Sequence, residues 1–421
     1  MRDVEKHIPS TYHTPKYTAY NLIEKQRQAN MTKLLKGVLT VFFVALLLTG
    51  CGAEEDTIKI GIISPNTGAL MVYGQSMTDA YKMAVDEINK SGGVCGRQLE
   101  LVIKDDKMEA TETVNCMNSL VADQVGLVIG SVTSACTAAI TDIANQEEVI
   151  LLTPTATEDS IAGGDDFVFR VCFADSFQGA IAAKCAKGMG YSEVGVLYCA
   201  SDAYSKGIYN AFVKACEILD LQIVDVETVA DVALTQDYSN QWSALARSQV
   251  GYVFAPFYYY TVGPYLVHQA RQAGFQGIIM GGDGYDGANG LQYQTGDLSD
   301  FNNVLFINHY FPGEGKGADF SQKFIELYGY FPDAFTALAY DSVYVLADAI
   351  ERAGSWEPSK VREALGDVDY RYSCVTGDFA FDRTGTPIKG AVIVEYIFNP
   401  LNLEENKVET RLRGRITVGE Q

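Results

Sequence analysis

The sequence predicts an α/β protein of two lobes, each built on a doubly wound parallel sheet. Short apolar strands recur about every 25–40 residues with helical segments between them, which is the pattern of βαβ units. The apolar runs do not alternate with polar residues, as expected for strands that helices cover on both faces. One hydrophobic core does not extend over a folded part of about 370 residues, so the chain should divide into two lobes.

Residues 1–50 are predicted to be a leader that precedes the fold. Basic residues come before an apolar run at 38–48, which is too short to span a bilayer comfortably and is typical of a secretory signal. The run ends in LTGC at residues 48–51, which resembles the bacterial lipobox. That resemblance implies a lipid on Cys51 and membrane attachment through it, with residues 51–56 as a polar tether. An uncleaved membrane anchor with a free cysteine is the alternative.

Apolar patterning predicts the elements of the first lobe in chain order. Residues 57–63 (TIKIGII) are expected to form a buried strand, and a loop at 64–72 follows. Residues 73–89 carry apolar side chains at helical spacing, and Gly92-Gly93 end that helix. The same criteria predict strands at 99–103, 125–129 and 149–152 and helices at 110–122 and 134–145.

The later part of the chain repeats this alternation. An amphipathic helix is predicted at 263–273, and the charged, weakly periodic segment beyond Pro400 is expected to be an exposed extension. Further strands are predicted near 194–198, 221–226, 251–255, 277–280 and 304–308. Because open sheets of this class bind ligands at the carboxyl ends of their strands, two such lobes should enclose a cleft between their loops.

The composition argues against several classes of function. The 421 residues include 53 acidic and 32 basic side chains, for a formal net charge of −21, whereas nucleic-acid binding needs a basic surface. The nine cysteines include Cys51, and no two of the other eight lie within four residues of each other, which argues against a CxxC metal or redox site. Their pairing is open among 105 arrangements. No metal and no cofactor are expected.

Hydroxyl side chains follow two neighbouring strands of the first lobe. The loop after 125–129 reads GSVTSA and enters a helix with Ser134 near its N-cap, where unpaired N–H groups suit a carboxylate. The loop at 153–157 reads TPTAT and follows the next strand. A single serine cap carries no functional weight, but two such loops at one sheet edge predict an anion site.

Two loops of the second half carry aromatic and acidic side chains. The strand at 252–255 runs into PFYYY at 256–260, whose tyrosine hydroxyls require water or a ligand unless the rings are core. The loop at 281–287 reads GGDGYDG. It contains a literal GxGxxG, but that motif should open the first βαβ unit, and two acids would repel a pyrophosphate. An acid held by glycines suits an ammonium group, or else it is a solvated turn. Together, the four loops fit a zwitterionic α-amino acid.

At these residues the chain resembles the periplasmic leucine/isoleucine/valine-binding proteins of ABC transporters. The resemblance runs from about Thr57 to about Asn399 and rests on several motifs in the right order. They are IKIGIISP at 58–65 with the following TG and YG, AVDEIN at 84–89 with GG, KDD at 104–106, TPTAT at 153–157 and QARQAG at 269–274.

The resemblance implies the type I periplasmic-binding-protein fold, with a ligand cleft and three hinge crossings between the lobes. It implies a first lobe at 57–176 and 307–383, a second lobe at 177–306 and 384–401, and a charged C-terminal extension at 402–421. It also implies a monomer outside the cytoplasm, anchored by its lipid to the outer face of the membrane. That monomer would capture a branched-chain or related amino acid for an ABC permease, and it would be no enzyme.

Contacts with the ligand are implied residue by residue. Ser134 and Thr157 would hold the carboxylate, and Asp283 would meet the ammonium together with the Thr155 carbonyl and Thr157. The acid of that family is a glutamate, one methylene longer than Asp283. Further expected contacts are Tyr73, Tyr204 and Tyr259, with Val132 and Thr133 lining the side-chain pocket and Phe177 beside it.

Two departures from the family pattern lie near this pocket. Thr133 stands where the branched-chain proteins have a disulfide cysteine, so that bridge should be absent. Phe177 stands where those proteins have an acidic residue. Because of these two changes, the sequence does not determine which side chain the ligand carries. The site for the ammonium and carboxylate groups of an amino acid is retained.

Two other functions remain as alternatives. A sensory ectodomain of the same fold would present an amino acid or amide to a membrane partner. An extracellular hydrolase would use Ser134 or Cys136 as nucleophile, with His309 a better candidate base than His268. The lack of a GxSxG motif and the small number of histidines count against catalysis.

Overall fold

Two sheets organise the part of the chain that the structure describes. The structure is a computed structural model. It describes residues 57–68, 70–164, 166–231, 235–258, 262–287, 297–398 and 409–417. The predicted leader, the tether and Cys51 lie outside these residues, and so does Tyr259. No helix in the described ranges is long and apolar enough to cross a membrane.

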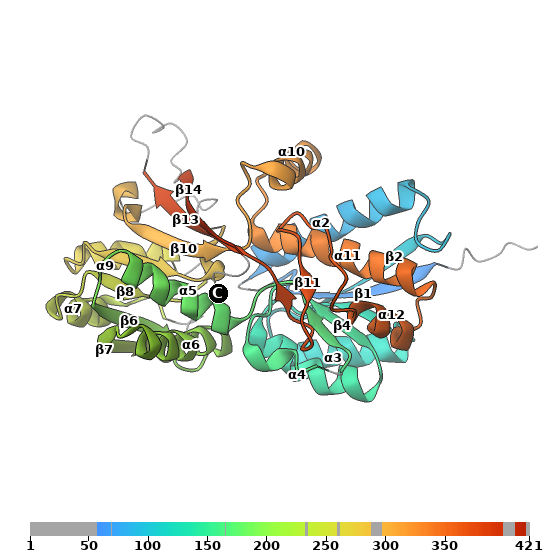
Figure 1. The fold of residues 1–421 in the computed structure, drawn as a ribbon, viewed down its shortest axis with the longest axis horizontal. Helices are drawn as coiled ribbons and strands as arrows, with labels where there is room; N and C mark the ends of the chain where they lie inside the picture. The colour runs from blue at the N-terminus through green and yellow to red at the C-terminus, as the bar shows by residue number, and fades with distance from the viewer. Residues whose placement is uncertain are drawn as a thin grey trace, which may run out of the picture. The chain divides into compact units, whose positions relative to one another are not determined.

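The first sheet has five parallel strands in the order β2-β1-β3-β4-β5 (Figure 1). The order reverses between β1 and β3, which makes the sheet doubly wound, as predicted. Its strands are β1 (Ile58–Ser64), β2 (Leu99–Asp105), β3 (Leu127–Ile129), β4 (Ile150–Thr153) and β5 (Val168–Arg170). The helices of this lobe are α2 (Met71–Lys90), α3 (Ala110–Ala122), α4 (Ser134–Gln146), α10 (Gly315–Tyr328), α11 (Ala334–Ala353) and α12 (Pro358–Leu365).

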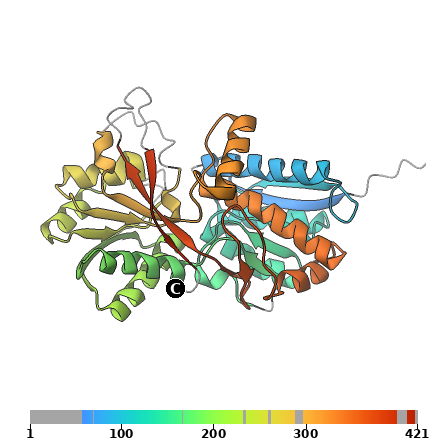
Figure 2. The ribbon, with the colours of Figure 1, turned by 45° about the horizontal axis from the view of Figure 1, so that its top comes forward.

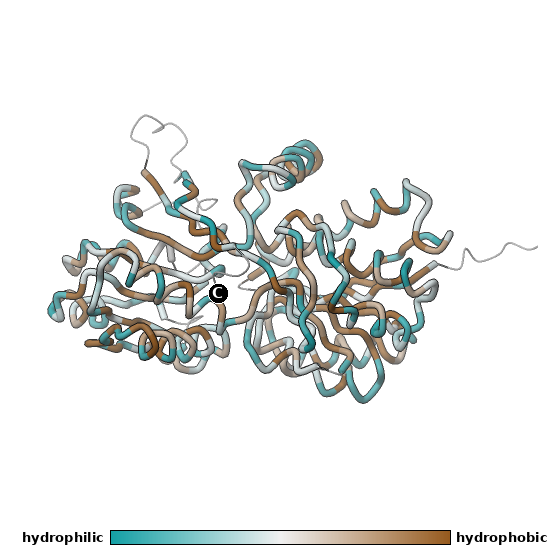
Figure 3. The backbone as a smooth tube through the Cα atoms, in the orientation of Figure 1, coloured by the Kyte–Doolittle hydropathy of each residue, from teal (hydrophilic) through white to brown (hydrophobic). Residues whose placement is uncertain are grey.

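Side chains of the first sheet alternate between two apolar layers. Ile62 and Leu127 belong to one core cluster with residues of α2 and α11. Their chain neighbours Ile63 and Val128 belong to a second cluster with residues of α3 and α4. Helices therefore cover both faces of the sheet, which explains why its inner strands β3 and β4 are nearly continuous apolar runs in the sequence (Figure 3).

The second sheet is mixed, with seven strands in the order β14-β13-β10-β9-β8-β6-β7. Its parallel strands are β6 (Glu193–Cys199), β7 (Gln222–Val229), β8 (Tyr252–Phe254), β9 (Ile278–Gly281) and β10 (Val304–Asn308). Its antiparallel strands are β13 (Ala391–Ile397) and β14 (Glu409–Ile416). Its helices are α5 (Asp175–Gly188), α6 (Ala203–Leu219), α7 (Ser239–Arg247) and α9 (His268–Gln272), the last continuing from the π-helical turn η2 (Val262–Val267).

The C-terminal segment corrects the predicted domain organisation. Residues 409–416, which we expected within the exposed extension at 402–421, form β14 and pair with β13 along its whole length. Exposed charged residues alternate with partly buried ones in β14. From the sequence alone this edge-strand pattern resembles that of a charged tail, because the buried positions are few and only half covered.

Three segments of chain cross between the sheets (Figures 1 and 2), and they contact one another. Lys389 Nζ donates to the Val171 carbonyl at 3.1 Å, and the rings of Phe173 and His309 stack with centroids 3.6 Å apart. The crossings are residues 171–174 before α5, 309–314 before α10 and 389–390 before β13.

The short hairpin of β11 (Ala380–Phe381) and β12 (Pro387–Ile388) precedes the third crossing. The Arg170 amide donates to the Gly385 carbonyl at 3.0 Å. Residues 384–388 therefore lie against the first sheet, and the return to the second lobe begins after them and not at residue 384.

A buried polar cluster joins the crossings to α11. Besides Val171, Lys389 Nζ donates to the Thr376 hydroxyl at 2.6 Å, and that hydroxyl donates to Asp341 at 2.7 Å. Asp341 also accepts from the amides of Val375 and Thr376, at 2.7 and 2.9 Å. Lys389 and Asp341 are each 1% exposed, so their charges interact in a medium that screens them weakly.

Asp333, the N-cap of α11, should make stability depend on pH. It accepts from the Thr336 amide at 2.8 Å, and burial together with the nearby Asp286 carboxylate raises its pKa from 3.8 to about 7. The folded chain therefore binds this proton more tightly than the unfolded chain. The resulting stabilisation is complete below about pH 4 and is lost as the pH rises through 7. Because Asp333 keeps some solvent contact, we expect a loss of about 1–2 kcal/mol between pH 5 and 8.

Urea unfolding of the wild type and of Asp333→Asn at pH 5 and pH 8 tests this expectation. Asparagine is also a good N-cap, so the variant should keep the helix and show a smaller difference between the two pH values. Asp297→Asn is the matched control, because Asp297 caps η5 (Leu298–Phe301) and hydrogen bonds lower its pKa. An unchanged pH difference in Asp333→Asn would contradict the assignment.

Candidate functional site

The predicted hydroxyl loops of the first lobe lie together at the carboxyl ends of β3 and β4. Thr133 is the N-cap of α4, with its hydroxyl accepting from the Cys136 amide at 3.4 Å, and Ser134 is the first residue of the helix. The Ser134 hydroxyl accepts from the Glu158 amide at 3.3 Å, and the Thr155 hydroxyl donates to the Val132 carbonyl at 2.7 Å. These contacts place the start of α4 beside the loop that follows β4.

The Thr157 hydroxyl differs from the others of this group because it makes no hydrogen bond in the described part of the chain. Its side chain is fully buried, and Oγ1 has no hydrogen-bond partner among the described residues. The loop around it is fixed by Arg170, whose guanidinium donates to the carbonyls of Thr157, Glu158 and Asp159 at 2.9, 2.8 and 3.1 Å. A buried hydroxyl without a partner is costly, so Thr157 is a natural contact for a bound group.

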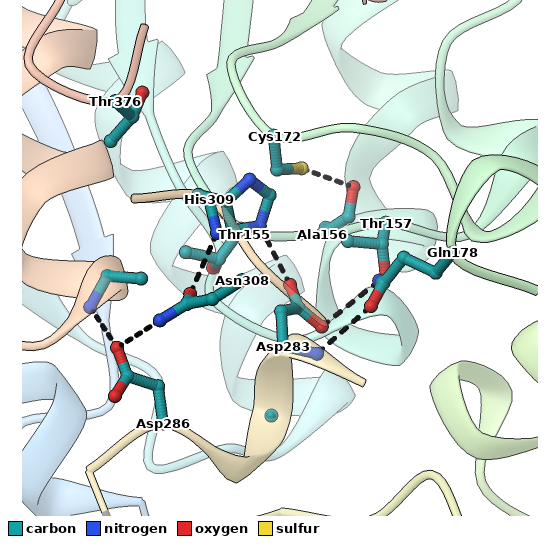
Figure 4. Close-up of polar contacts among 12 residues, drawn as sticks. Thr155, Ala156, Thr157, Cys172, Gln178, Asp283, Asp286, Asn308, His309 and Thr376 are labelled. Carbon is teal, nitrogen blue, oxygen red and sulfur yellow. Dashed lines mark hydrogen bonds and ion pairs between the residues drawn. The ribbon is translucent and has the colours of Figure 1, made fainter. Parts of the chain in front are cut away.

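Asp283 begins the turn η3 (Asp283–Tyr285) after β9, and its carboxylate is completely buried (Figure 4). Oδ1 accepts from the Tyr204 hydroxyl at 2.9 Å and from Gln178 Nε2 at 3.1 Å. Oδ2 lies 3.0 Å from Nε2 of His309. The predicted acid is therefore ordered by three side chains from three separate elements.

The environment of His309 favours its uncharged form. Burial lowers its pKa from 6.5 to about 4, although the hydrogen bond to Asp283 acts in the opposite direction. Because a carboxylate only accepts, Nε2 carries the hydrogen of the neutral ring.

The second acid of the glycine-rich loop has a different role. Asp286 Oδ2 accepts from the Ala334 amide at the start of α11 and from Asn308 Nδ2, at 2.7 and 2.9 Å. Burial raises the pKa of Asp286. The Tyr73 hydroxyl, from α2 of the first lobe, donates to the carbonyls of Asp286 and Gly284 at 2.6 and 3.0 Å. Asp286 and Tyr73 thus join the two lobes, whereas Asp283 is the acid of this loop without such a contact. Asp175, the first residue of α5, is another fully buried acid, and burial raises its pKa.

Cys172, on the first crossing, lies near the first-lobe loop and near Asp283. Its thiol donates to the Ala156 carbonyl at 3.3 Å. Burial raises the pKa of Cys172 to about 12, and the Asp283 carboxylate adds to the increase while Arg170 opposes it. Figure 4 shows Thr155 and Thr157 in the same view as Asp283 and His309. The described cysteines are all free thiols.

The remaining predicted residues differ in environment. Val132 and Thr133 are buried, at 2% and 5% exposure, at the turn into α4. Phe177 is half-buried and packs against Phe173, with ring centroids 5.3 Å apart. Tyr204 is 4% exposed, and its hydroxyl also accepts from the Gly284 amide at 2.9 Å.

Sequence reasoning missed two residues of this site. Arg170 is a single charge inside the apolar run VFRVCF, and a buried arginine must find several acceptors, so this pattern could have identified it. Gln178 follows Phe177 on α5, and no sequence pattern singles it out.

The hydrolase alternative required a base beside a nucleophile. Within the described residues, no histidine nitrogen lies within hydrogen-bond distance of Ser134 or Cys136, and burial raises the pKa of the Cys136 thiol. His268, the other candidate base, is the first residue of α9, and its Nδ1 lies 2.6 Å from Oδ2 of Asp300. The arrangement therefore offers hydrogen-bonding groups for a ligand and no activated nucleophile at these two positions.

Known proteins resemble this chain over nearly its whole described length. A family model described as periplasmic binding protein matches residues 57–399. The leucine-, isoleucine-, valine-, threonine- and alanine-binding protein of Pseudomonas aeruginosa is 32% identical over 82% of this chain and 92% of its own length. The substrate-binding protein of a branched-chain amino acid transporter from Streptococcus pneumoniae, solved with isoleucine, is 31% identical over 85% of this chain and 99% of its own, with a TM-score of 0.75. A leucine-binding protein from Thermotoga maritima is 30% identical over 87% of this chain and its own full length, with a TM-score of 0.73.

Proposed function

The chain belongs to the periplasmic binding protein family, and from that premise we propose that it captures an amino acid between its two lobes and delivers it to an ABC permease. The buried carboxylate of Asp283 carries the proposal, because its three hydrogen-bonding partners are uncharged groups. A buried anion without a cationic partner among the described residues suits a ligand's ammonium group. The Pseudomonas relative is named for five amino acids, and the Streptococcus relative was solved with isoleucine.

The carboxylate of the ligand would lie on the first lobe. Ser134 and the amides at the start of α4 offer hydrogen-bond donors and the positive end of a helix. The Thr157 hydroxyl would gain the partner that it lacks. The ammonium would meet Asp283 and the Thr155 carbonyl. Such a ligand contacts both lobes and favours the closed arrangement that a permease recognises.

The side chain of the ligand would contact both apolar and small polar residues. Val132 and Phe177 offer apolar surface, and the Thr133 side chain is small. We propose an aliphatic amino acid, in line with the relatives' names. Tyr73, Tyr204 and Tyr259 complete the proposed ligand-binding set.

The chain would work outside the cytoplasm as a lipid-anchored monomer. The lipobox-like LTGC at residues 48–51 supports a lipid on Cys51. Intact-mass measurement of the protein extracted from bacterial membranes tests this: a diacylglycerol-modified chain that begins at Cys51 is expected, and an unmodified N-terminus at Met1 or Met31 would contradict it.

Binding of leucine and of two truncated analogues to the full chain tests the proposed function. Leucine should raise the melting temperature by mass action, and calorimetry should give its dissociation constant. 4-Methylpentanoic acid lacks the ammonium and isopentylamine lacks the carboxylate, so each should bind at least about 100-fold more weakly, because a buried charged group then loses its partner. If no α-amino acid shifts the melting temperature, or if 4-methylpentanoic acid binds as tightly as leucine, the proposal is wrong.

A further inference from the structure

The carboxylate of Asp283 is hydrogen-bonded by neutral groups from three elements. Tyr204 comes from α6, Gln178 from α5, and His309 from the residue after β10. None of the four side chains is more than 4% exposed. Three donors that carry no charge can stabilise the buried anion without cancelling its charge, whereas a lysine or arginine in the same place would neutralise it.

Two of these side chains also fix the main chain of the turn. Gln178 Oε1 accepts from the Asp283 amide at 3.0 Å, and the Tyr204 hydroxyl accepts from the Gly284 amide at 2.9 Å. The backbone and Oδ1 are therefore held by the same pair of residues. The orientation of Oδ2 depends on a different contact, the one with His309 at 3.0 Å.

Counting acceptor sites shows where a cation would bind. Each carboxylate oxygen accepts about two hydrogen bonds. Oδ1 already has two donors, from Tyr204 and Gln178, while Oδ2 has one, from His309. Among the described residues, the acceptor position left over is on Oδ2. An ammonium group would therefore share that oxygen with the imidazole.

The plane of the His309 ring is itself fixed. The ring stacks on Phe173 with centroids 3.6 Å apart and an angle of 18° between the planes. The His309 amide donates to Asn308 Oδ1 at 2.8 Å. Phe173 and His309 lie on two of the three crossings, so the hinge itself sets the direction of the Nε2–H bond.

From this geometry we propose that His309 is a positioning residue for the cationic group of the ligand: its neutral Nε2–H aims Oδ2 of Asp283 at the ammonium. This proposal rests on the proposed function, because it assumes that the ligand carries an ammonium group. It adds a residue from the hinge, which the ligand itself need not touch.

Two variants at this position separate positioning from packing. His309→Gln places an amide N–H near the position of Nε2, whereas His309→Met keeps the bulk of the side chain and removes the donor. We expect His309→Met to weaken leucine binding about tenfold, since a hydrogen bond to a charged group is lost, with little change for 4-methylpentanoic acid. His309→Gln should keep the wild-type preference for leucine over 4-methylpentanoic acid within about threefold.

Calorimetry with both ligands, on the full chain, is the decisive measurement. A His309→Met protein that loses affinity for both ligands equally, or for neither, overturns the proposal, and so does a His309→Gln protein that behaves like His309→Met. A wild type that shows no preference for leucine refutes the proposed function itself. If the wild type prefers leucine and the variants fail as described, the role of His309 alone is refuted.

A measurement without ligand covers the case in which a variant does not fold. Two-bond 1H–15N spectra of the wild type report which ring nitrogen of each histidine carries the hydrogen, and His268→Gln assigns the signals. We expect a neutral ring with the hydrogen on Nε2 for His309 at pH 6. A charged ring, or a hydrogen on Nδ1, overturns the proposal.

Discussion

Replacing Asp283 by asparagine is expected to weaken leucine binding by about 100- to 1,000-fold, because a buried ammonium would lose its charged partner. The fold should survive, since asparagine has the same shape and the Gln178 and Tyr204 side chains still hold the backbone of the turn. The melting temperature without ligand should therefore change far less than the affinity.

Calorimetry of the variant with leucine and with 4-methylpentanoic acid measures this effect. The acid has no ammonium, so its affinity should hardly change, and the loss for leucine alone identifies the partner of Asp283. Asp86→Asn is the control, because Asp86 is an exposed acid that pairs with Lys90 on α2. An Asp283→Asn protein with wild-type affinity for leucine would rule out the ammonium assignment.

Replacing Lys389 by methionine should lower the free energy of unfolding by about 3 kcal/mol. Lys389 is buried between the Val171 carbonyl and the Thr376 hydroxyl, and that hydroxyl links it to Asp341. Removing the lysine leaves the buried Asp341 without a cation, which typically costs more than losing both charges together. Burial lowers the pKa of Lys389, and the Asp341 carboxylate opposes that shift.

A double-mutant cycle with Asp341→Asn tests the link through urea unfolding. The double variant should lose clearly less stability than the sum of the two single losses, since it buries no unpaired charge. Lys316→Met is the control, because Lys316 is half exposed and bonds Asp378 at the surface, where such pairs contribute little. Additive losses at Lys389 and Asp341 would show that the two residues act independently.

Most of the fold could be predicted from the sequence, because strands that are buried on both faces must have apolar sequences. Strands such as β3 and β4 send alternate side chains into two covered layers, so they must be almost wholly apolar. β14 follows another rule: it lies at a sheet edge, with exposed arginines between half-buried residues, although its partner β13 is the strand just before it in the chain. A strand with so few buried positions has the same local pattern as an exposed charged segment.

The candidate site also contains residues that could be predicted from the sequence and residues that could not. Ser134, Thr155 and Thr157 follow strands, so their place at a sheet edge could be predicted from the sequence. The loop at 281–287 contains two acids, and the sequence does not say which of them would contact a ligand. The structure distinguishes them, because the Ala334 amide and Asn308 donate hydrogen bonds to the Asp286 carboxylate. Gln178 and His309 come from remote parts of the chain, and only the folded structure brings them to Asp283.

The pairing of β14 with β13 bears on solubility. Without β14, the nearly fully buried β13 would end the sheet with a row of unpaired backbone groups, a template for joining to the same edge of another molecule. β14 occupies that edge and carries Arg411, Arg413 and Arg415, which pair with Glu395 and Glu314. A second chain approaching this edge would meet charged, ion-paired side chains and not the apolar β13, so we expect the C-terminal strand to protect the protein against aggregation.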